Sequence, residues 1–136
     1  MMKIDIRYYT KSGHTEKLAN AISEVINVPA KPISEKLDED IDILFLGSSI
    51  YGNSIDPTLP KFFNDIDVNI GSIVSFSTAG VMESTYEQIV ELANLYGISV
   101  DKREFHCRGE FAGINKGRPN SADVENIKRF VRDILD

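Results

Sequence analysis

Hydroxyl-bearing side chains and a glycine cluster near the N-terminus, in residues 8–17, which read YYTKSGHTEK. The stretch lies between a short apolar run and the segment LANAISEVI, whose apolar period is that of an amphipathic helix. Backbone N–H groups at a helix start carry a partial positive charge, and neighbouring hydroxyls add donors, so such a loop can bind an anion. A helix cap needs only one hydroxyl, and the surplus therefore favours phosphate binding. The residues concerned are Thr10, Ser12, Gly13 and Thr15.

Two widespread nucleotide-binding motifs are absent from this loop. A Walker loop ends in Gly-Lys followed by Ser or Thr, whereas Lys11 precedes Gly13 here. The pattern Gly-x-Gly-x-x-Gly does not occur either. The chain also lacks the hydrolase signatures Gly-x-Ser-x-Gly and His-Glu-x-x-His. If the loop binds a phosphate, it does so with another arrangement of residues.

The segments around this loop predict a parallel sheet covered by helices. Four short apolar runs bounded by turn residues predict buried strands, namely residues 3–9, 42–47, 72–77 and 98–105. A fifth run, residues 29–33, contains two prolines, which suits an edge strand. The connection that follows it, SEKLDED, is too short for a long helix, so a single turn is expected. Because strands and helices alternate, the chain is predicted to be a single α/β domain, residues 1–136, with helices on both faces of the sheet.

Three segments have apolar residues at helical spacing. An Asn120 cap with Asp123 three residues later marks the start of the last one. The apolar faces consist of Leu18, Ile22, Val25 and Ile26, then Tyr86, Ile89, Val90 and Ala93, and finally Val124, Ile127, Val131 and Ile134.

The composition excludes several classes of partner. A formal net charge of -6 and a pI near 4.9 argue against DNA or RNA, because phosphate backbones bind basic faces. No apolar run approaches the length of about 20 residues that a membrane span needs, and the N-terminal residues lack the apolar core of a signal peptide. The single cysteine, Cys107, suits a reducing compartment. We therefore expect a cytoplasmic protein.

The acidic residues are unevenly distributed. Residues 38–101 contain eleven carboxylates and one base, Lys61, whereas residues 102–136 contain eight bases and six acids. One interpretation is a solvated surface that aids solubility. The other is an acidic docking face, which depends on the function of the middle third.

The first loop and its helix resemble the flavodoxin signature. Arg7 departs from it, because an apolar residue is usual there, and we expect its side chain to point outward at a strand edge. The resemblance extends along the whole chain in the order of its elements, and it implies a flavodoxin-like doubly wound five-stranded parallel sheet with strand order 2-1-3-4-5. The matching residues are Ile6, Tyr8, Thr10, Gly13, Thr15, Ala19 and Ile22.

The resemblance implies a phosphate site for FMN. In flavodoxins the first loop binds the 5′-phosphate of FMN without a metal ion. The hydroxyls of Thr10, Ser12 and Thr15 would be ligands here, with the backbone amides of residues 11–15, Lys11 and Gly13 included, completing the site. His14 is either a further donor or a surface histidine at a helix start.

The loops after the third and fourth predicted strands are expected to contact the flavin ring, because ligands bind beyond the carboxyl ends of such strands. Tyr51 would stack on the ring, and the Gly52–Asn53 peptide matches the one that flips in flavodoxins. No second aromatic residue lies between Ser77 and Thr85, so one face of the ring would be only partly covered. The expected ring contacts are Ser49, Ile50, Tyr51, Gly52, Asn53, Ser77, Thr78, Ala79 and Gly80.

Cys107 and His106 are adjacent, which raises the question of a nucleophile. Neighbouring residues of a strand point to opposite faces, however, so a buried structural cysteine is the favoured interpretation. A metal site would need a third or fourth ligand, and the sequence around this pair offers none.

Three functions remain open on the sequence alone. The leading hypothesis is an FMN-binding flavodoxin-like electron carrier whose redox partner proteins dock on the acidic surface at the flavin edge. The alternative is an oxidoreductase of the same fold that acts on a quinone or a tetrapyrrole, resembling the flavodoxin-like protoporphyrinogen oxidases, because the loop GSSIYG is similar. A flavin-free receiver-type domain would need acids at the ends of its first and third strands, where Thr10 and Ser49 stand instead.

Overall fold

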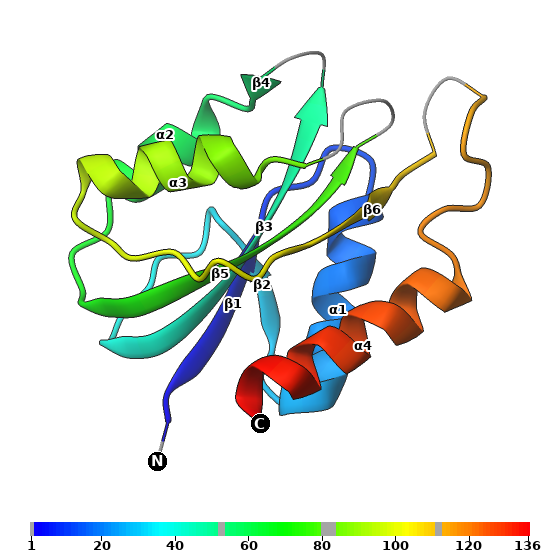
Figure 1. Cartoon of the computed structure of the whole chain (residues 1–136). Helices are drawn as coiled ribbons and strands as arrows, with labels where there is room; N and C mark the ends of the chain where they lie inside the picture. Colours follow the sequence, from blue (N-terminus) through cyan, green and yellow to red (C-terminus); the bar gives the residue numbers. More distant parts are fainter. Residues whose placement is uncertain (1, 52–53, 80–83, 111–112) are drawn as a thin grey trace.

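A central sheet organises the chain (Figure 1). The computed structural model describes residues 2–51, 54–79, 84–110 and 113–136, and at Ile50, Tyr51 and Ser54 it describes the backbone but not the side chains. Five strands run parallel in the order β2-β1-β3-β5-β6, and the short β4 pairs antiparallel with β3. The strands are β1 (Ile4–Tyr8), β2 (Ala30–Pro32), β3 (Ile41–Tyr51), β4 (Ser54–Ile55), β5 (Ile70–Ala79) and β6 (Phe105–Arg108).

Helices cover both faces of this sheet, as predicted. Figure 1 shows α1 and α4 on one face and α2 and α3 on the other. The helices are α1 (His14–Ile26), α2 (Thr58–Asn64), α3 (Tyr86–Leu95) and α4 (Ser121–Leu135). The five parallel strands, counted without β4, have the predicted order 2-1-3-4-5, so the fold prediction is confirmed.

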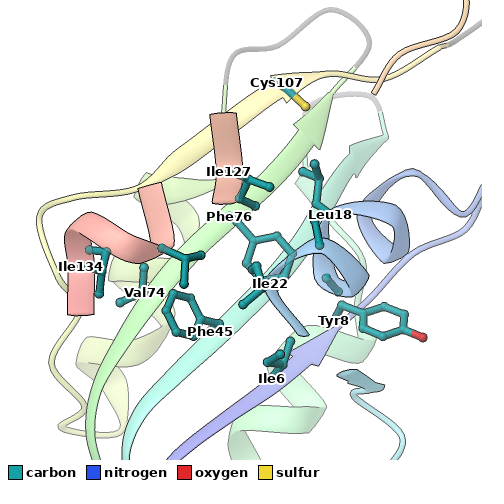
Figure 2. Packing of buried hydrophobic residues seen from close by; sticks show 13 residues of the cluster. Ile6, Tyr8, Leu18, Ile22, Phe45, Val74, Phe76, Cys107, Ile127 and Ile134 are labelled. Carbon is teal, nitrogen blue, oxygen red and sulfur yellow. The ribbon is translucent and has the colours of Figure 1, made fainter. Parts of the chain in front are cut away.

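Side chains of β3 and β5 alternate between two hydrophobic cores, as the pleat of a strand requires. Phe45 and Phe76 lie in the core under α1 and α4, which Figure 2 shows, whereas Leu46 and Ile73 lie in the core under α2 and α3. All four side chains have no measurable solvent exposure. Because both faces are buried, these strands consist of nearly continuous apolar residues.

Two element predictions need correction. The short helix α2 was not predicted, because seven residues are too few to show a helical period. The strand expected at residues 98–105 lies later, at β6, and only an isolated bridge between Val100 and Ile73 precedes it. The pairing is interrupted where the carboxylate of Asp101 accepts a hydrogen bond from the backbone N–H of Arg103, at 2.9 Å, and forms a local turn.

The expectation for Arg7 is wrong. Its side chain is only 2% exposed, and it lies beneath the turn that follows β2. The guanidinium donates to the carboxylate of Asp5 at 2.7 Å and to the main-chain oxygens of Glu35 at 2.8 Å and Lys36 at 3.2 Å. A buried charge is tolerated only when it is paired and hydrogen-bonded, and Arg7 meets both conditions.

The predictions for the short connection and for the last helix are confirmed. The N–H of Glu35 donates to the main-chain oxygen of Pro32 at 3.0 Å, which closes a single turn. At α4, the side chain of Asn120 accepts from the N–H of Asp123 at 3.0 Å, and the carboxylate of Asp123 accepts from the N–H of Asn120 at 2.8 Å. This reciprocal pair satisfies two amides at the helix start.

Candidate functional site

The loops that follow β1, β3 and β5 leave the sheet at the same edge, the one formed by the carboxyl ends of the strands, because these strands are parallel neighbours. In Figure 1 this edge also contains the start of α1. The N–H of Tyr9 donates to the main-chain oxygen of Gly47 at 3.0 Å, so the first loop departs directly beside β3. Ligands of open α/β sheets bind at this edge, which makes it the candidate site.

Helix α1 begins without a side-chain cap. Gly13 is its N-cap residue, with a φ of 91°, a conformation that glycine adopts without strain. The first hydrogen bond of the helix runs from the N–H of Lys17 to the oxygen of Gly13, at 3.1 Å. The amides before Lys17 therefore have no partner inside the helix. In contrast to α4, which has its reciprocal cap, α1 presents these amides to the loop.

The loop before α1 is organised around Thr10. The hydroxyl of Thr10 accepts a hydrogen bond from the N–H of Gly13 at 2.9 Å, so its own proton can be donated elsewhere. Lys11 and Ser12 are exposed, and His14 is half-buried. A Cβ on Gly13 would have no atom within 4 Å, which shows open space beside the loop.

Thr15 differs from the other hydroxyl residues of the loop, because it is fully buried. Its hydroxyl lies 2.9 Å from the hydroxyl of Thr78, also contacts the hydroxyl of Ser49, and donates to the main-chain oxygen of Ser48 at 3.3 Å. Ser49 and Thr78 are paired across β3 and β5, and both are 3% exposed. The structure thus brings together three predicted site residues from three different elements.

A second group of hydroxyls lies on the opposite face of the same strands. The hydroxyls of Ser48 and Thr85 are 2.6 Å apart, and the N–H of Thr85 donates to the hydroxyl of Ser77 at 3.4 Å. The predicted site residue Ser77 therefore lies beneath the start of α3, on the other face from Thr15. The roles of Ser48 and Thr85 were not foreseen. Ser48 pairs with Ser77 near the ends of two apolar strands, which is the signal that could have revealed it, whereas Thr85 lies outside the strands, at the start of α3.

The start of α1 also contacts the chain that follows β6. The Nε2 atom of His14 lies 2.9 Å from the main-chain oxygen of Glu110, and a Cβ on Gly109 would come 3.1 Å from the His14 ring. The ammonium of Lys17 donates to the main-chain oxygen of Pro119 at 2.5 Å. His14 is therefore more than a surface residue, since it ties a loop to the candidate site.

Cys107 is buried, as predicted. Its side chain is 7% exposed and belongs to the core under α1 and α4, whereas the neighbouring His106 is exposed and contacts Glu104 at 2.7 Å. Burial, together with the nearby Asp123 carboxylate, raises the pKa of the Cys107 thiol to about 12. A thiol that stays protonated is a poor nucleophile.

Part of the predicted site falls outside the described residues. Gly52, Asn53 and Gly80 belong to that part, and for Ile50 and Tyr51 only the backbone is described. The backbone of β3 reaches Tyr51, and Ile50 pairs with Ala79 of β5. The two loops that were expected to contact a flavin ring therefore start side by side.

A groove of about 500 Å³ is lined in part by Thr10. Its lining residues include Tyr8, Tyr9, Ile33 and Phe62. Its described lining includes no residue of the loops that follow β3 and β5, so it is separate from the expected ring site.

In the described part of the chain, no helix has the length and apolar character of a membrane span.

Comparison with known proteins identifies the fold. No protein-family model matches the chain. An uncharacterized protein of Methanocaldococcus jannaschii is 29% identical over an alignment of 151 residues, and the alignment covers 98% of this chain and 99% of that protein. A flavodoxin from the domain Archaea superposes with a TM-score of 0.76 at 18% identity, over 98% of this chain and 96% of the other. Oxidised flavodoxin 1 of Bacillus cereus superposes with a TM-score of 0.73 at 19% identity, over 98% and 97%.

These likenesses, together with the strand order, define the class: the protein has the flavodoxin-like fold. Further structural neighbours include a putative flavoprotein of Bacteroides uniformis, with a TM-score of 0.71 at 15% identity over 96% of this chain and 98% of the other. Flavodoxins and flavoproteins recur among the structural neighbours, which confirms the fold that the resemblance of the first loop implied.

Proposed function

We propose that the protein binds FMN and transfers electrons between protein partners. The observation that carries this proposal is the start of α1, which has no side-chain cap and follows a hydroxyl loop at the ligand-binding edge of the sheet. The free amides of the first turn, with the hydroxyls of Thr10 and Ser12, would bind the phosphate of the cofactor. This donor set suits an anion, because it offers only N–H and O–H groups and a partial positive charge.

The ring of the flavin would lie against the two loops that follow β3 and β5. Ser49 and Thr78, near the ends of these strands, are neighbours across the sheet, so the two loops begin side by side, as contact with one planar group would require. A bound flavin would supply reversible one- and two-electron transfer. The protein would supply the binding, the orientation and the local charge that tune it.

The acidic surface supports a carrier that meets a basic partner. The chain has a formal net charge of -6, and exposed carboxylates such as Glu87 and Glu91 lie on α3, which begins just after the second ring-contacting loop. Charges of one sign around a redox centre raise the rate of encounter with a partner of opposite charge.

Binding of FMN can be tested directly. The protein, stripped of any ligand, is titrated with FMN, riboflavin and FAD, and binding is followed through the quenching of flavin fluorescence. FMN should bind more tightly than riboflavin, because only FMN reaches the amides of α1 with a phosphate. Thr10→Ala should weaken FMN binding by about 1.5–3 kcal/mol, the usual loss for a hydrogen bond to a charged group, without changing riboflavin binding. Equal affinities for FMN and riboflavin in the parent protein would refute the phosphate site.

The oxidoreductase alternative keeps the same cofactor and differs in what is reduced. It was motivated by an uncovered face of the ring near residues 79–82, most of which lie outside the described residues. The two functions are separated by their response to salt and to surface charge.

A further inference from the structure

The hydroxyl of Thr15 has a full set of hydrogen-bonding partners within the protein. A hydroxyl has one proton and two lone pairs. The main-chain oxygen of Ser48, 3.3 Å away, can only accept, so this contact uses the proton of Thr15. In the contacts with the hydroxyls of Ser49 and Thr78 either group can donate, and the two lone pairs of Thr15 are available to accept from them. With those two hydroxyls donating, Thr15 has no further capacity for a phosphate oxygen.

The methyl group of Thr15 is fixed as well. A Cβ built on Gly47 would lie 2.9 Å from the Cγ2 atom of Thr15 and would overlap the ring of Phe76. The methyl therefore fills a space over β3 that only a glycine leaves open. A rotation about χ1 that turned the hydroxyl toward the loop would move this methyl and would break the contacts to Ser49 and Thr78, and the side chain of threonine is stiff at χ1.

The partners of Thr15 lie near the ends of β3 and β5, shortly before the loops that would contact the flavin ring. Ser49 pairs with Thr78, and the next pair in the register is Ile50 with Ala79. The two hydroxyls are themselves 3.3 Å apart, so Thr15 closes a triangle of buried hydroxyls that joins α1 to both strand ends. Such a network fixes the positions of the groups it connects, because Ser49 and Thr78 both lose a buried hydrogen-bonding partner if Thr15 moves.

We propose that Thr15 is a positioning residue, whose hydroxyl fixes the ends of β3 and β5 and thereby the two loops that would contact the flavin ring, and that it is not a phosphate ligand. The proposal rests on the proposed function and deepens it. It reverses the role that the flavodoxin resemblance implied for this hydroxyl, and it leaves the phosphate to Thr10, Ser12 and the amides of α1.

Four variants test the assignment. Thr15→Val keeps the shape and the methyl but removes the hydroxyl, and Thr15→Ser keeps the hydroxyl. Thr78→Val removes a partner from the other end of the triangle. Thr10→Ala is the matched control, because Thr10 lies in the same loop but outside the triangle. FMN and riboflavin affinities are measured for each variant, and urea unfolding of the ligand-free protein is recorded beside them.

If Thr15 positions the loops, its replacement should weaken binding of the flavin ring and leave binding of the phosphate unchanged. Thr15→Val and Thr78→Val should weaken FMN and riboflavin by the same factor, about tenfold for the loss of a buried hydrogen bond. Thr15→Ser should remain within about threefold of the parent for both ligands, because the triangle is retained. Thr10→Ala should weaken only FMN. If Thr15→Val weakens FMN but not riboflavin, its hydroxyl is a phosphate ligand and the proposal is wrong; it is equally wrong if neither affinity changes.

A measurement without flavin separates this proposal from the proposed function. Amide hydrogen exchange of the ligand-free protein should be faster at Ser49, Ile50 and Ala79 in Thr15→Val than in Thr10→Ala, by more than the change in global stability explains. If the parent protein binds neither flavin, the proposed function fails, and the exchange data still decide the role of Thr15. Unchanged local exchange in Thr15→Val would overturn the positioning role.

Discussion

The guanidinium of Arg7 donates through Nε to the main-chain oxygen of Glu35, at 2.8 Å, across the edge of the sheet. A second hydrogen bond, 3.2 Å long, reaches the main-chain oxygen of Lys36. A charged side chain on β1 thus anchors the turn that leads from the edge strand β2 to the central strand β3. The edge strand β2 has only three residues and therefore few hydrogen bonds to β1. The contacts of Arg7 with the turn add hydrogen bonds that so short a strand cannot supply.

Replacing Arg7 should therefore loosen the turn after β2. Arg7→Met keeps most of the apolar stem but removes the hydrogen bonds to the turn and the ion pair with Asp5, and we expect a loss of about 1–3 kcal/mol in the free energy of unfolding. The carboxylate left behind is partly exposed, which limits the cost. Urea unfolding measures the change. Lys36→Gln, which removes an exposed ion pair to Asp67, is the control and should leave stability nearly unchanged. Equal stability of both variants would show that the Arg7 contacts are dispensable.

The close approach of Gly47 to Phe76 gives a second prediction. Any side chain at Gly47 would overlap the ring of Phe76 and press on the methyl of Thr15. Gly47→Ala should destabilise the protein by about 1–3 kcal/mol, the usual cost of overpacking a well-filled core. The double variant Gly47→Ala/Phe76→Leu should recover part of this loss relative to Phe76→Leu alone, because the smaller side chain makes room. A fully additive double variant would contradict the steric explanation.

The Cys107 thiol gives a prediction for alkaline pH. Burial raises its pKa from the usual value of 9.0 to about 12 in the folded protein, so the unfolded chain loses this proton first. Between these two values the unfolded state binds fewer protons than the folded state, and stability must therefore fall as the pH rises. Cys107→Ala removes this contribution. The parent protein should lose stability more steeply than Cys107→Ala between pH 9 and pH 11, followed by urea unfolding. Parallel curves would contradict the raised pKa.

The central elements of the fold could be predicted from the sequence because their signals are local. The apolar runs that became β3 and β5 are buried on both faces, and such burial leaves a continuous pattern in the chain. The cap of α4 likewise depends on two residues three apart, Asn120 and Asp123. Helix α2 left no such pattern in its seven residues, so its existence depends on packing that the sequence does not display.

The site was predictable in its residues and less so in their roles. The loop at Thr10 and Gly13 and the hydroxyls at Ser49 and Thr78 were identified, and the structure brings Thr15, Ser49 and Thr78 into contact. The Thr15 hydroxyl points inward because of long-range contacts, since its partners are more than thirty residues away along the chain. The same holds for the contacts of Arg7 with Glu35 and Lys36, because sequence spacing cannot place their turn over this side chain.

The acidic surface yields the prediction that separates the carrier from the oxidoreductase. Glu87→Gln/Glu91→Gln removes two charges on α3, and Glu125→Gln/Asp133→Asn removes two charges on α4, on the other face of the sheet. At an ionic strength of about 0.1 M, the Debye length is about 10 Å, so only charges close to the docking site affect the encounter. If the flavin-loaded protein is a carrier, electron transfer to a basic acceptor such as cytochrome c should slow as salt rises, and the α3 variant should be slower than the α4 variant. Asp56 is left unchanged because it accepts hydrogen bonds from Tyr9 and Thr58, at 2.7 Å each, and its removal would disturb the start of α2.

The oxidoreductase alternative expects steady turnover of a quinone or a tetrapyrrole that depends on neither salt nor the carboxylates of α3 and α4. That outcome would replace the carrier with an enzyme while leaving the FMN site intact.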